Sequence, residues 1–548
     1  MHNNNICLLS SYFIYCQFGG SKRKWTYLKH SGPLFPPPYQ KHNIPVVYNG
    51  TPIELNIEAE EYATLFSKYL ETEYITNSTF KRNFWKDWKD ILGKQHPIQS
   101  LEGCDFTKIY NYLLQKKEEK KLITPTQKEA QKKEEEKYKI AIVDGKSQPV
   151  GNYRIEPPGI FIGRGCNPKL GKVKKRIYPE DITINIGKGE PIPSLPDFLQ
   201  SHKWGKIIND QTVEWLAGWK DDITGKTKYV WLGAQSDLKA QSDINKFNLA
   251  RKLKRRIKTI REKNELQLKS DQLIMRQIAT ALYFIDKFAL RVGNEKGEDE
   301  TDTVGVTSLR VEHIKLLENN KVELDFLGKD YIRFKRTLEV SSQVYKNLKE
   351  FISGKNLDDN LFDQITSNDV NKYLQSFMPN ITAKVFRTYN ASNLFQKELL
   401  KIDKKFINYN EADKINLLLD EFNKANAKVA LLCNHQKNVT ASTNKQIDNI
   451  NEMVKTLKQR LRKAKTANKK NPDTIMKLQD KIKKLKAKKS LKLELKNISL
   501  GTSKINYIDP RITASFMKRH DFPVDKIFSK TLQDKFRWAF DVDKDFKF

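Results

Sequence analysis

The chain changes character near Ala234, and that change limits the folds open to it. Between residues 143 and 231, short β-rich runs such as DITINI (181–186) and KYVWL (228–232) are separated by Pro and Gly. From about residue 234 onward, apolar residues recur three and four positions apart, which is typical of helices. With 548 residues, the chain is long enough for more than one buried core. We therefore expect an α+β multi-domain protein whose β-containing N-terminal lobes precede a mainly helical domain.

Two predicted helices end near polar residues. Apolar residues from 274 to 289 step by four, four, three and four, which predicts a helix ending at Arg291 with Gly293 as its C-cap. A second apolar face over 415–432 predicts a helix that ends just before His435. Between them, KVELDF (321–326) alternates with period two. A turn of sequence LGKD follows, and YIRFK then resumes the alternation. This pattern predicts a β-hairpin with Lys329 at its tip.

Two antiparallel helices are predicted near the C-terminus. Apolar residues step by three and four over 447–461 and again over 475–485, and Asn471-Pro472-Asp473 interrupts the pattern. The remaining positions are mostly Lys and Arg. We expect a protruding basic coiled-coil linker over 439–496, followed by a small helical C-terminal domain.

The composition favours a polyanionic partner. The chain has 99 Lys and Arg against 66 Asp and Glu, a formal net charge of +33. Such an excess indicates nucleic acid first and an anionic membrane surface second. The five cysteines never form C-x-x-C, the eight histidines never form H-x-x-x-H, and no G-x-x-x-x-G-K-[ST] loop occurs. We therefore expect an intracellular chain without a disulfide framework, a metal site or nucleotide hydrolysis.

An apolar stretch over 6–18 stands at the N-terminus. It is too short to span a bilayer, and no basic segment precedes it as in a signal peptide. A buried or disordered extension is the favoured interpretation, and a targeting role is the alternative.

Cleavage of a phosphodiester without a metal needs a nucleophile, cations on the non-bridging oxygens and an acid for the leaving alkoxide. Arg suits the second task because its fork donates two parallel hydrogen bonds. Lys suits the third because burial and neighbouring cations lower its pKa, and guanidinium groups also lower the pKa of Tyr. Taken singly, Tyr507, Arg387, Lys329 and His435 each have a structural interpretation that is more frequent than a catalytic one.

Eight sequence motifs, taken together and in order, identify a protein family more specifically than any single residue does. They are KW-YL-H-GP-F-PPY (24–39), EPPGIFIGRG-NPK-G (156–171), ALYFIDKFALRVGNEK (281–296), DTVGVTSLRVEHI (302–314), DFLGKD (325–330), TAKVFRTYNAS (382–392), LLCNHQ (431–436) and LGTSKINYIDPRIT (500–513). Over nearly its whole length, the chain resembles the eukaryotic type IB DNA topoisomerases (nuclear DNA topoisomerase I).

The resemblance implies a catalytic set. Tyr507 would be the nucleophile, and Lys329 would protonate the 5′ leaving oxygen from the hairpin tip. Arg291 and Arg387 would bind the phosphate, and His435 would donate to a non-bridging oxygen. Further DNA contacts implied by the resemblance are Arg164, Lys228, Tyr229, Lys246, Lys296, Thr303, Asp330, Lys384 and Asn506.

Some of these contacts have more specific implied roles. Arg164 would read the minor groove beside the cleavage site, and Asp330 would orient it through a salt bridge. Together with Asn506, these two residues match the family's pocket for camptothecin-type inhibitors. Ile162 departs from the family, which usually has another arginine there, so one DNA contact should be weaker.

The implied function is relaxation of supercoiled duplex DNA through a transient 3′-phosphotyrosyl link, without ATP or a divalent metal. The implied fold is a DNA clamp, and we expect a monomer that acts in the nucleus and not at a membrane. The N-terminal extension that is long and charged in many relatives is not seen, so the nuclear-targeting signal is not identified. The predicted domains are an uncertain extension (1–20), N-terminal core lobes (21–233), a catalytic core (234–438), the linker (439–496) and a C-terminal domain (497–548).

Two other functions stay open. Tyrosine recombinases use a related set of residues, but they typically carry His three positions before the second arginine, where this chain has Lys384. An architectural DNA-binding protein, in which the tyrosine and the arginines are structural, is the non-enzymatic alternative.

Overall fold

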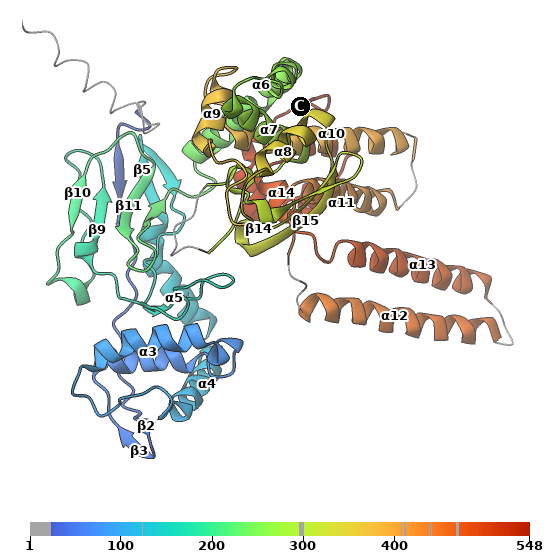
Figure 1. The fold of residues 1–548 in the computed structure, drawn as a ribbon. Helices are drawn as coiled ribbons and strands as arrows, with labels where there is room; N and C mark the ends of the chain where they lie inside the picture. The colour runs from blue at the N-terminus through green and yellow to red at the C-terminus, as the bar shows by residue number, and fades with distance from the viewer. Residues whose placement is uncertain are drawn as a thin grey trace, which may run out of the picture. The chain divides into compact units, whose positions relative to one another are not determined.

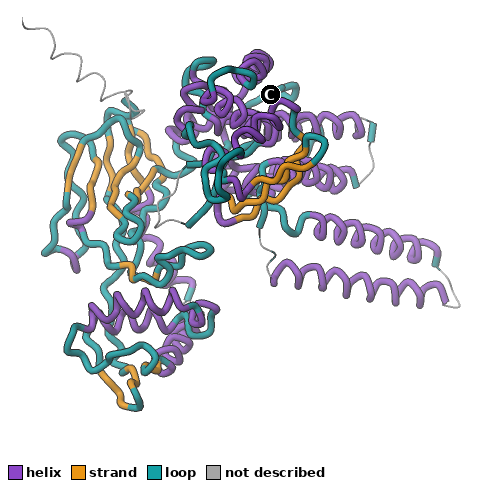
Figure 2. Tube along the Cα trace, in the orientation of Figure 1, coloured by secondary structure: helices purple, strands orange, loops and turns teal. Residues whose placement is uncertain are grey.

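The computed structural model describes residues 23–122, 124–294, 301–406, 408–409, 413–437, 439, 441–466 and 471–548 (Figure 1). The apolar N-terminal stretch and Lys296 lie outside these residues. The described chain forms two compact units, the first from its start to Ser242 with Thr301 and the second from Asp243 with the residues after Thr301. Mixed α and β structure was predicted, and it is observed (Figure 2). The bounds of the five predicted domains stay predictions.

The first unit contains two cores. One lies under a four-stranded sheet of order β10-β9-β11-β12 and a three-stranded sheet of order β1-β5-β6. Their strands are β10 (Lys206–Ile208), β9 (Ile182–Asn185), β11 (Trp215–Lys220), β12 (Thr227–Trp231), β1 (Leu28–His30), β5 (Ile140–Val143) and β6 (Lys146–Pro149). Of the β-rich runs singled out in the sequence, DITINI contains β9 and KYVWL overlaps all of β12 except Thr227.

The second core of this unit is helical and aromatic. The apolar faces of α2 (Ile57–Ser67) and α3 (Ser78–Leu92) bury Phe66, Phe84 and Trp88. The surrounding elements are β2 (Val46–Tyr48), β3 (Thr51–Ile53), β4 (Cys104–Asp105), α4 (Thr107–Lys121), β7 (Gly159–Ile160) and β8 (Val173–Lys174). Helix α5 (Pro125–Glu136) follows α4, and its Glu135 pairs with Arg154.

The second unit is mainly helical, as predicted, around one large core. Its helices are α6 (Asp237–Gln267, which begins in the first unit), α7 (Leu273–Phe288), α8 (Ser342–Ile352), α9 (Ser367–Gln375), α10 (Ala383–Phe406), α11 (Lys414–Leu432), α14 (Leu500–Asn506), α15 (Pro510–Arg519), α16 (Val524–Ile527) and α17 (Lys530–Lys535). Among these described helices, none is both long and apolar enough to cross a membrane.

The predicted hairpin and the predicted helix before His435 are confirmed. β14 (Lys321–Gly328) and β15 (Ile332–Glu339) pair antiparallel up to Gly328 opposite Ile332, and β13 (Ile314–Leu317) adds a third strand. Lys329 therefore stands in the three-residue turn. Helix α11 ends at Leu432.

The end of α7 differs from the prediction. The helix stops at Phe288, because Ala289 adopts a left-handed conformation with φ 52° and ψ 34°. The carbonyl of Ala289 accepts a hydrogen bond from Arg387, a tertiary contact that sequence periodicity does not report. Arg291 thus lies in the segment that follows the helix, and Gly293 is not its cap.

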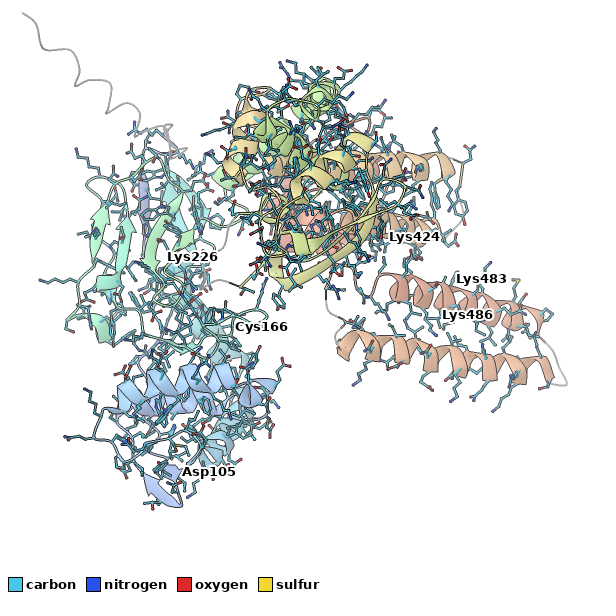
Figure 3. The ribbon with its side chains drawn as sticks, viewed as in Figure 1. Asp105, Cys166, Lys226, Lys424, Lys483 and Lys486 are labelled. Atoms are coloured by element: carbon cyan, nitrogen blue, oxygen red, sulfur yellow. The ribbon has the colours of Figure 1, made fainter. Side chains whose placement is uncertain are left out.

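The basic coiled coil is confirmed as a helical hairpin. α12 (Ala441–Thr466) and α13 (Pro472–Glu494) lie side by side, and the side chain of Asn471 accepts from Thr474 N–H to cap α13. The seam residues Ile447, Ile450, Leu457 and Ile482 are buried, as their spacing predicts. Exposed lysines project from α13, including the labelled Lys483 and Lys486 (Figure 3).

Candidate active site

Four of the five predicted catalytic side chains line one cavity of about 100 Å³ in the second unit. Arg291 reaches it from the segment after α7, and Arg387 from α10. Lys329 reaches it from the β14–β15 turn, and His435 from just after α11. Leu290, Phe326 and Phe334 form apolar walls. Segments 144 positions apart in sequence therefore meet at one site.

Tyr507, the fifth residue, lies beside the cavity and contacts three of its lining residues. Its hydroxyl oxygen accepts a hydrogen bond of 3.0 Å from Nη1 of Arg291. The guanidinium of Arg387 lies 5.1 Å from the centre of the Tyr507 ring, and the His435 ring lies 5.2 Å from it. The side chain is 6% exposed. The sequence-predicted nucleophile is thus packed among the predicted anion-binding groups.

Helix α14 and Ser392 hold the backbone of Tyr507. Its N–H donates to the carbonyl of Ser503, one turn earlier, at 3.0 Å. Its carbonyl accepts from Oγ of Ser392 on α10 at 3.0 Å, and the same Oγ accepts from Asp509 N–H. The segment around the tyrosine is therefore fixed from both sides.

Arg387 connects the ends of two helices. It is 4% exposed, and it donates to the carbonyls of Ala289 after α7 and of Cys433 after α11, the latter at 2.9 Å. Its Nε has no hydrogen-bond partner within the described chain. A buried polar group without a partner is rare, so this nitrogen, on a residue that lines the cavity, is a candidate donor to a bound anion.

Arg291 is held by two crossing segments. Its carbonyl accepts from Val306 N–H at 2.9 Å, and the carbonyl of Val292 accepts from Thr307 N–H at 2.7 Å. A Cβ on Gly305 would lie 2.3 Å from Cα of Gly293, so no larger residue fits where the two backbones cross. This crossing explains the Gly293 that the sequence suggested as a helix cap.

Lys329 is exposed at the turn, where the backbone of the next two residues is left-handed. Asp330 has φ 69° and Tyr331 has φ 62°. Asp330 also lines the cavity. The Lys329 ammonium group therefore stands at the tip of the hairpin and lines the cavity.

His435 is buried, and its two ring nitrogens differ. Nδ1 shares a hydrogen bond of 2.7 Å with Oγ of Ser503. Nε2 is buried and has no partner among the described residues. The His435 carbonyl accepts from Ser499 N–H at 2.8 Å, which joins this segment to the start of α14.

The two arginines set the protonation of the site. Burial raises the pKa of Tyr507, but Arg387 and Arg291 outweigh burial and hold it below the usual range for a tyrosine. Burial, together with the same two arginines, lowers the pKa of His435 to about 3. The site therefore favours a neutral imidazole near pH 7, and it makes the Tyr507 hydroxyl easier to deprotonate than that of an ordinary tyrosine.

The other predicted DNA contacts are distributed over both units. In the second unit, Lys384 and Asn506 are exposed, Thr303 is half-buried, and Lys246 pairs with Asp243 at 2.7 Å. In the first unit, Arg164 is exposed in a loop. Lys228 pairs there with Glu156 and Asp221, and Tyr229 packs between Trp215 and Trp231. Their DNA-binding roles stay predictions.

Sequence reasoning missed the residues that position the site. Ser503 contacts His435, Ser392 fixes Tyr507, and Asp509 pairs with Arg511 at 2.7 Å just after the tyrosine. Ser503 is within the LGTSKINYIDPRIT word, four residues before Tyr507. Helical spacing alone places it on the tyrosine's side of α14, so this signal was available.

Three family models match the chain. They describe the DNA-binding fragment (residues 23–232) and the catalytic core (235–468) of eukaryotic DNA topoisomerase I, and a C-terminal topoisomerase domain (479–548). Together they cover most of both units.

Individual relatives agree with the family models. DNA topoisomerase 1 alpha of Arabidopsis thaliana is 44% identical over 97% of this chain and 60% of its own length. DNA topoisomerase 1 of Caenorhabditis elegans is 42% identical over 95% of this chain and 67% of its own length. A Homo sapiens protein named mitochondrial DNA topoisomerase I is 39% identical over 96% of this chain and 92% of its own length. The chain thus spans about 60% of the length of the Arabidopsis relative. With three matching family models and this identity along nearly all of its length, the chain belongs to the eukaryotic DNA topoisomerase I family.

Proposed function

We propose that the protein is a type IB DNA topoisomerase that relaxes supercoiled duplex DNA without ATP or a divalent metal. The observation that carries the proposal is the 3.0 Å hydrogen bond from Arg291 to the hydroxyl of Tyr507, beside Arg387 and His435. A tyrosine whose pKa is lowered by two arginines is suited to attack a phosphodiester. The family assignment supports DNA as the substrate.

In the proposed cleavage step, the Tyr507 oxygen attacks one phosphorus of the duplex and the bond to the 5′ oxygen breaks. The phenolic proton passes to water, and Lys329 protonates the departing 5′ oxygen. Arg291, Arg387 and the Nε2–H of His435 bind the non-bridging oxygens. Each such preorganised donor contributes about 3–4 kcal/mol to the transition state at comparable oxyanion sites.

Religation reverses these steps. The energy of the broken phosphodiester is retained in the tyrosyl ester, so the 5′ hydroxyl can restore the strand without ATP. Between the two steps, the free end rotates about the intact strand and the supercoils relax. The basic hairpin of α12 and α13 would slow this rotation through its exposed lysines, including Lys483 and Lys486.

A plasmid assay tests the activity directly. Purified chain is incubated with negatively supercoiled plasmid in EDTA without ATP, and we expect a ladder of relaxed topoisomers. Recombined products would instead indicate a tyrosine recombinase. Plasmid that is shifted but never relaxed would indicate an architectural DNA-binding protein, and either result would contradict the proposal.

Salt should weaken DNA binding steeply. A chain with a net charge of +33 displaces counterions from the duplex, and log K falls by about 0.9 for each phosphate contact per log unit of salt. We expect relaxation to become distributive and then to fail as KCl rises, which a titration followed by gel electrophoresis measures. Relaxation that does not change with KCl concentration would contradict binding of the DNA through electrostatic contacts with its phosphates.

Camptothecin-type inhibitors should trap the cleaved complex. The family's inhibitor pocket corresponds to Arg164, Asp330 and Asn506, and all three residue types are present. We expect more protein-linked DNA after the reaction is stopped with detergent in the presence of the drug. No increase with a chain that relaxes plasmid normally would refute this prediction.

We further propose that the protein acts as a monomer in the nucleus. The basic composition and the family support this location. A fluorescent fusion found only in mitochondria would contradict the location, and an active dimer in sedimentation would contradict the monomer.

A further inference from the structure

Helix α14, which ends just before Tyr507, carries a residue that also faces the site. Ser503 is fully buried, and its Oγ lies 2.7 Å from Nδ1 of His435. Its carbonyl accepts both Tyr507 N–H and Ile508 N–H at 3.0 Å. One residue therefore holds the backbone of the proposed nucleophile and also contacts the imidazole beside it.

The tautomer of His435 decides what this imidazole can do. A neutral imidazole has one N–H donor and one acceptor nitrogen. Arg291, Arg387 and Lys329 make the cavity a site for an anion, and phosphate oxygens only accept hydrogen bonds. His435 helps to bind such an anion only if Nε2, which is buried and has no partner within the described chain, carries the proton.

We propose that Ser503 is a positioning residue that donates its hydroxyl proton to Nδ1 of His435 and so keeps the His435 proton on Nε2, facing the cavity. This inference rests on the proposed function and extends it. The neutral state of the ring supports it, since burial together with Arg387 and Arg291 lowers the pKa of His435 to about 3. If the His435 ring were doubly protonated, both nitrogens would donate, and no partner such as Ser503 would be needed to select the tautomer.

The arrangement also couples two parts of the site. Because Ser503 is on α14 and Tyr507 directly follows the end of this short helix, docking of α14 brings the nucleophile and the tautomer-fixing hydroxyl into place together. The imidazole is then oriented before DNA binds. Such preorganisation is what makes a hydrogen-bond donor effective in a transition state.

The direct test is nitrogen NMR of the full chain labelled with ¹⁵N-histidine. The chain has eight histidines, so a His435→Gln sample assigns the His435 signals by difference. We expect the wild-type protein at pH 7 to show His435 as a neutral ring with the proton on Nε2. We expect Ser503→Ala to shift the signals toward a mixture of both tautomers.

A buried serine elsewhere supplies the matched control. Ser515 on α15 is also fully buried, and its Oγ donates to the carbonyl of Lys544 at 2.6 Å. Ser515→Ala should leave the His435 spectrum unchanged. In single-turnover cleavage, Ser503→Ala should lose roughly 10- to 100-fold, by analogy with the range found when the partner that orients a metal-binding imidazole is removed. Ser503→Thr, which keeps the hydroxyl, should restore the wild-type tautomer.

Two results would overturn the inference. They are a wild-type His435 with its proton on Nδ1, and a Ser503→Ala protein whose His435 stays wholly protonated on Nε2. The spectrum is recorded without DNA, so a protein that proves inactive would refute the proposed function while leaving the tautomer measurement valid. A folded Ser503→Ala protein, checked by its thermal unfolding, is sufficient for the NMR comparison.

Discussion

Replacing Tyr507 by Phe should abolish strand cleavage while leaving the fold intact. The substitution removes only the hydroxyl that accepts from Arg291, and the ring can keep its contacts with Arg387 and His435. Removal of a catalytic nucleophile typically costs a factor of 10⁴–10⁶ in rate, so we expect relaxation to fall by at least about 10⁴-fold. A dilution series on supercoiled plasmid measures the loss, and binding to uncut duplex should persist.

Tyr373→Phe is the matched control. Tyr373 lies in the same unit, and its buried hydroxyl has no hydrogen-bond partner among the described residues. Its removal should leave relaxation within a few fold of wild type. If Tyr507→Phe relaxed plasmid at the wild-type rate, residue 507 could not be the nucleophile.

Replacing Arg387 by Lys should also impair cleavage, although less strongly than Tyr507→Phe, even though the charge is kept. A lysine ammonium cannot reproduce the fork that donates to the carbonyls of Ala289 and Cys433 and also present the free Nε. We expect cleavage to fall by roughly 10²–10³-fold, the usual cost of removing one transition-state donor. The carbonyls left without partners should lower the free energy of unfolding by about 1–3 kcal/mol.

The pH dependence of cleavage distinguishes the effect of the Arg387 charge from the effect of its hydrogen-bond geometry. Arg387 is the strongest influence that lowers the pKa of Tyr507 against burial. In Arg387→Gln this influence is gone, the pKa of Tyr507 rises, and the phenolate forms only at higher pH. We therefore measure the single-turnover cleavage rate from pH 6 to 10. The rise in rate with pH should occur at a higher pH in Arg387→Gln than in wild type or Arg387→Lys.

Arg276→Lys controls for the loss of a partly buried arginine. Arg276 also donates to two carbonyls, those of Ser270 and Asp271, but it is not among the residues that line the active-site cavity. The Arg276→Lys protein should be less stable than wild type but should cleave DNA at the wild-type rate. If the Arg387→Lys protein cleaved DNA as fast as the Arg276→Lys protein, the proposed role of the Arg387 guanidinium would be contradicted.

Local patterns in the sequence were sufficient for the elements that carry the site. The hairpin around Lys329 and the helix before His435 follow from periodicity and turn composition, which act over a few residues. The basic hairpin of α12 and α13 was predictable for the same reason, since its seam repeats every three and four residues.

Contacts between distant segments could not be predicted in this way. Helix α7 ends where Ala289 takes a left-handed conformation, for which alanine has no sequence preference, and its carbonyl binds Arg387, 98 positions later. Ser392 and His435 contact residues 115 and 68 positions away through single hydrogen bonds. A lone serine in a helix forms no pattern, so only the folded chain identifies its partner.

The most direct measurement of the central claim is the chemical identity of the link between protein and DNA. The chain is allowed to cleave a duplex oligonucleotide, the reaction is stopped with detergent, and the digested adduct is sequenced by mass spectrometry. We predict a phosphodiester from the 3′ end of the cut strand to the oxygen of Tyr507, with a free 5′ hydroxyl on the other fragment that a kinase can label. An adduct on any other residue, or a link to the 5′ end, would contradict the account.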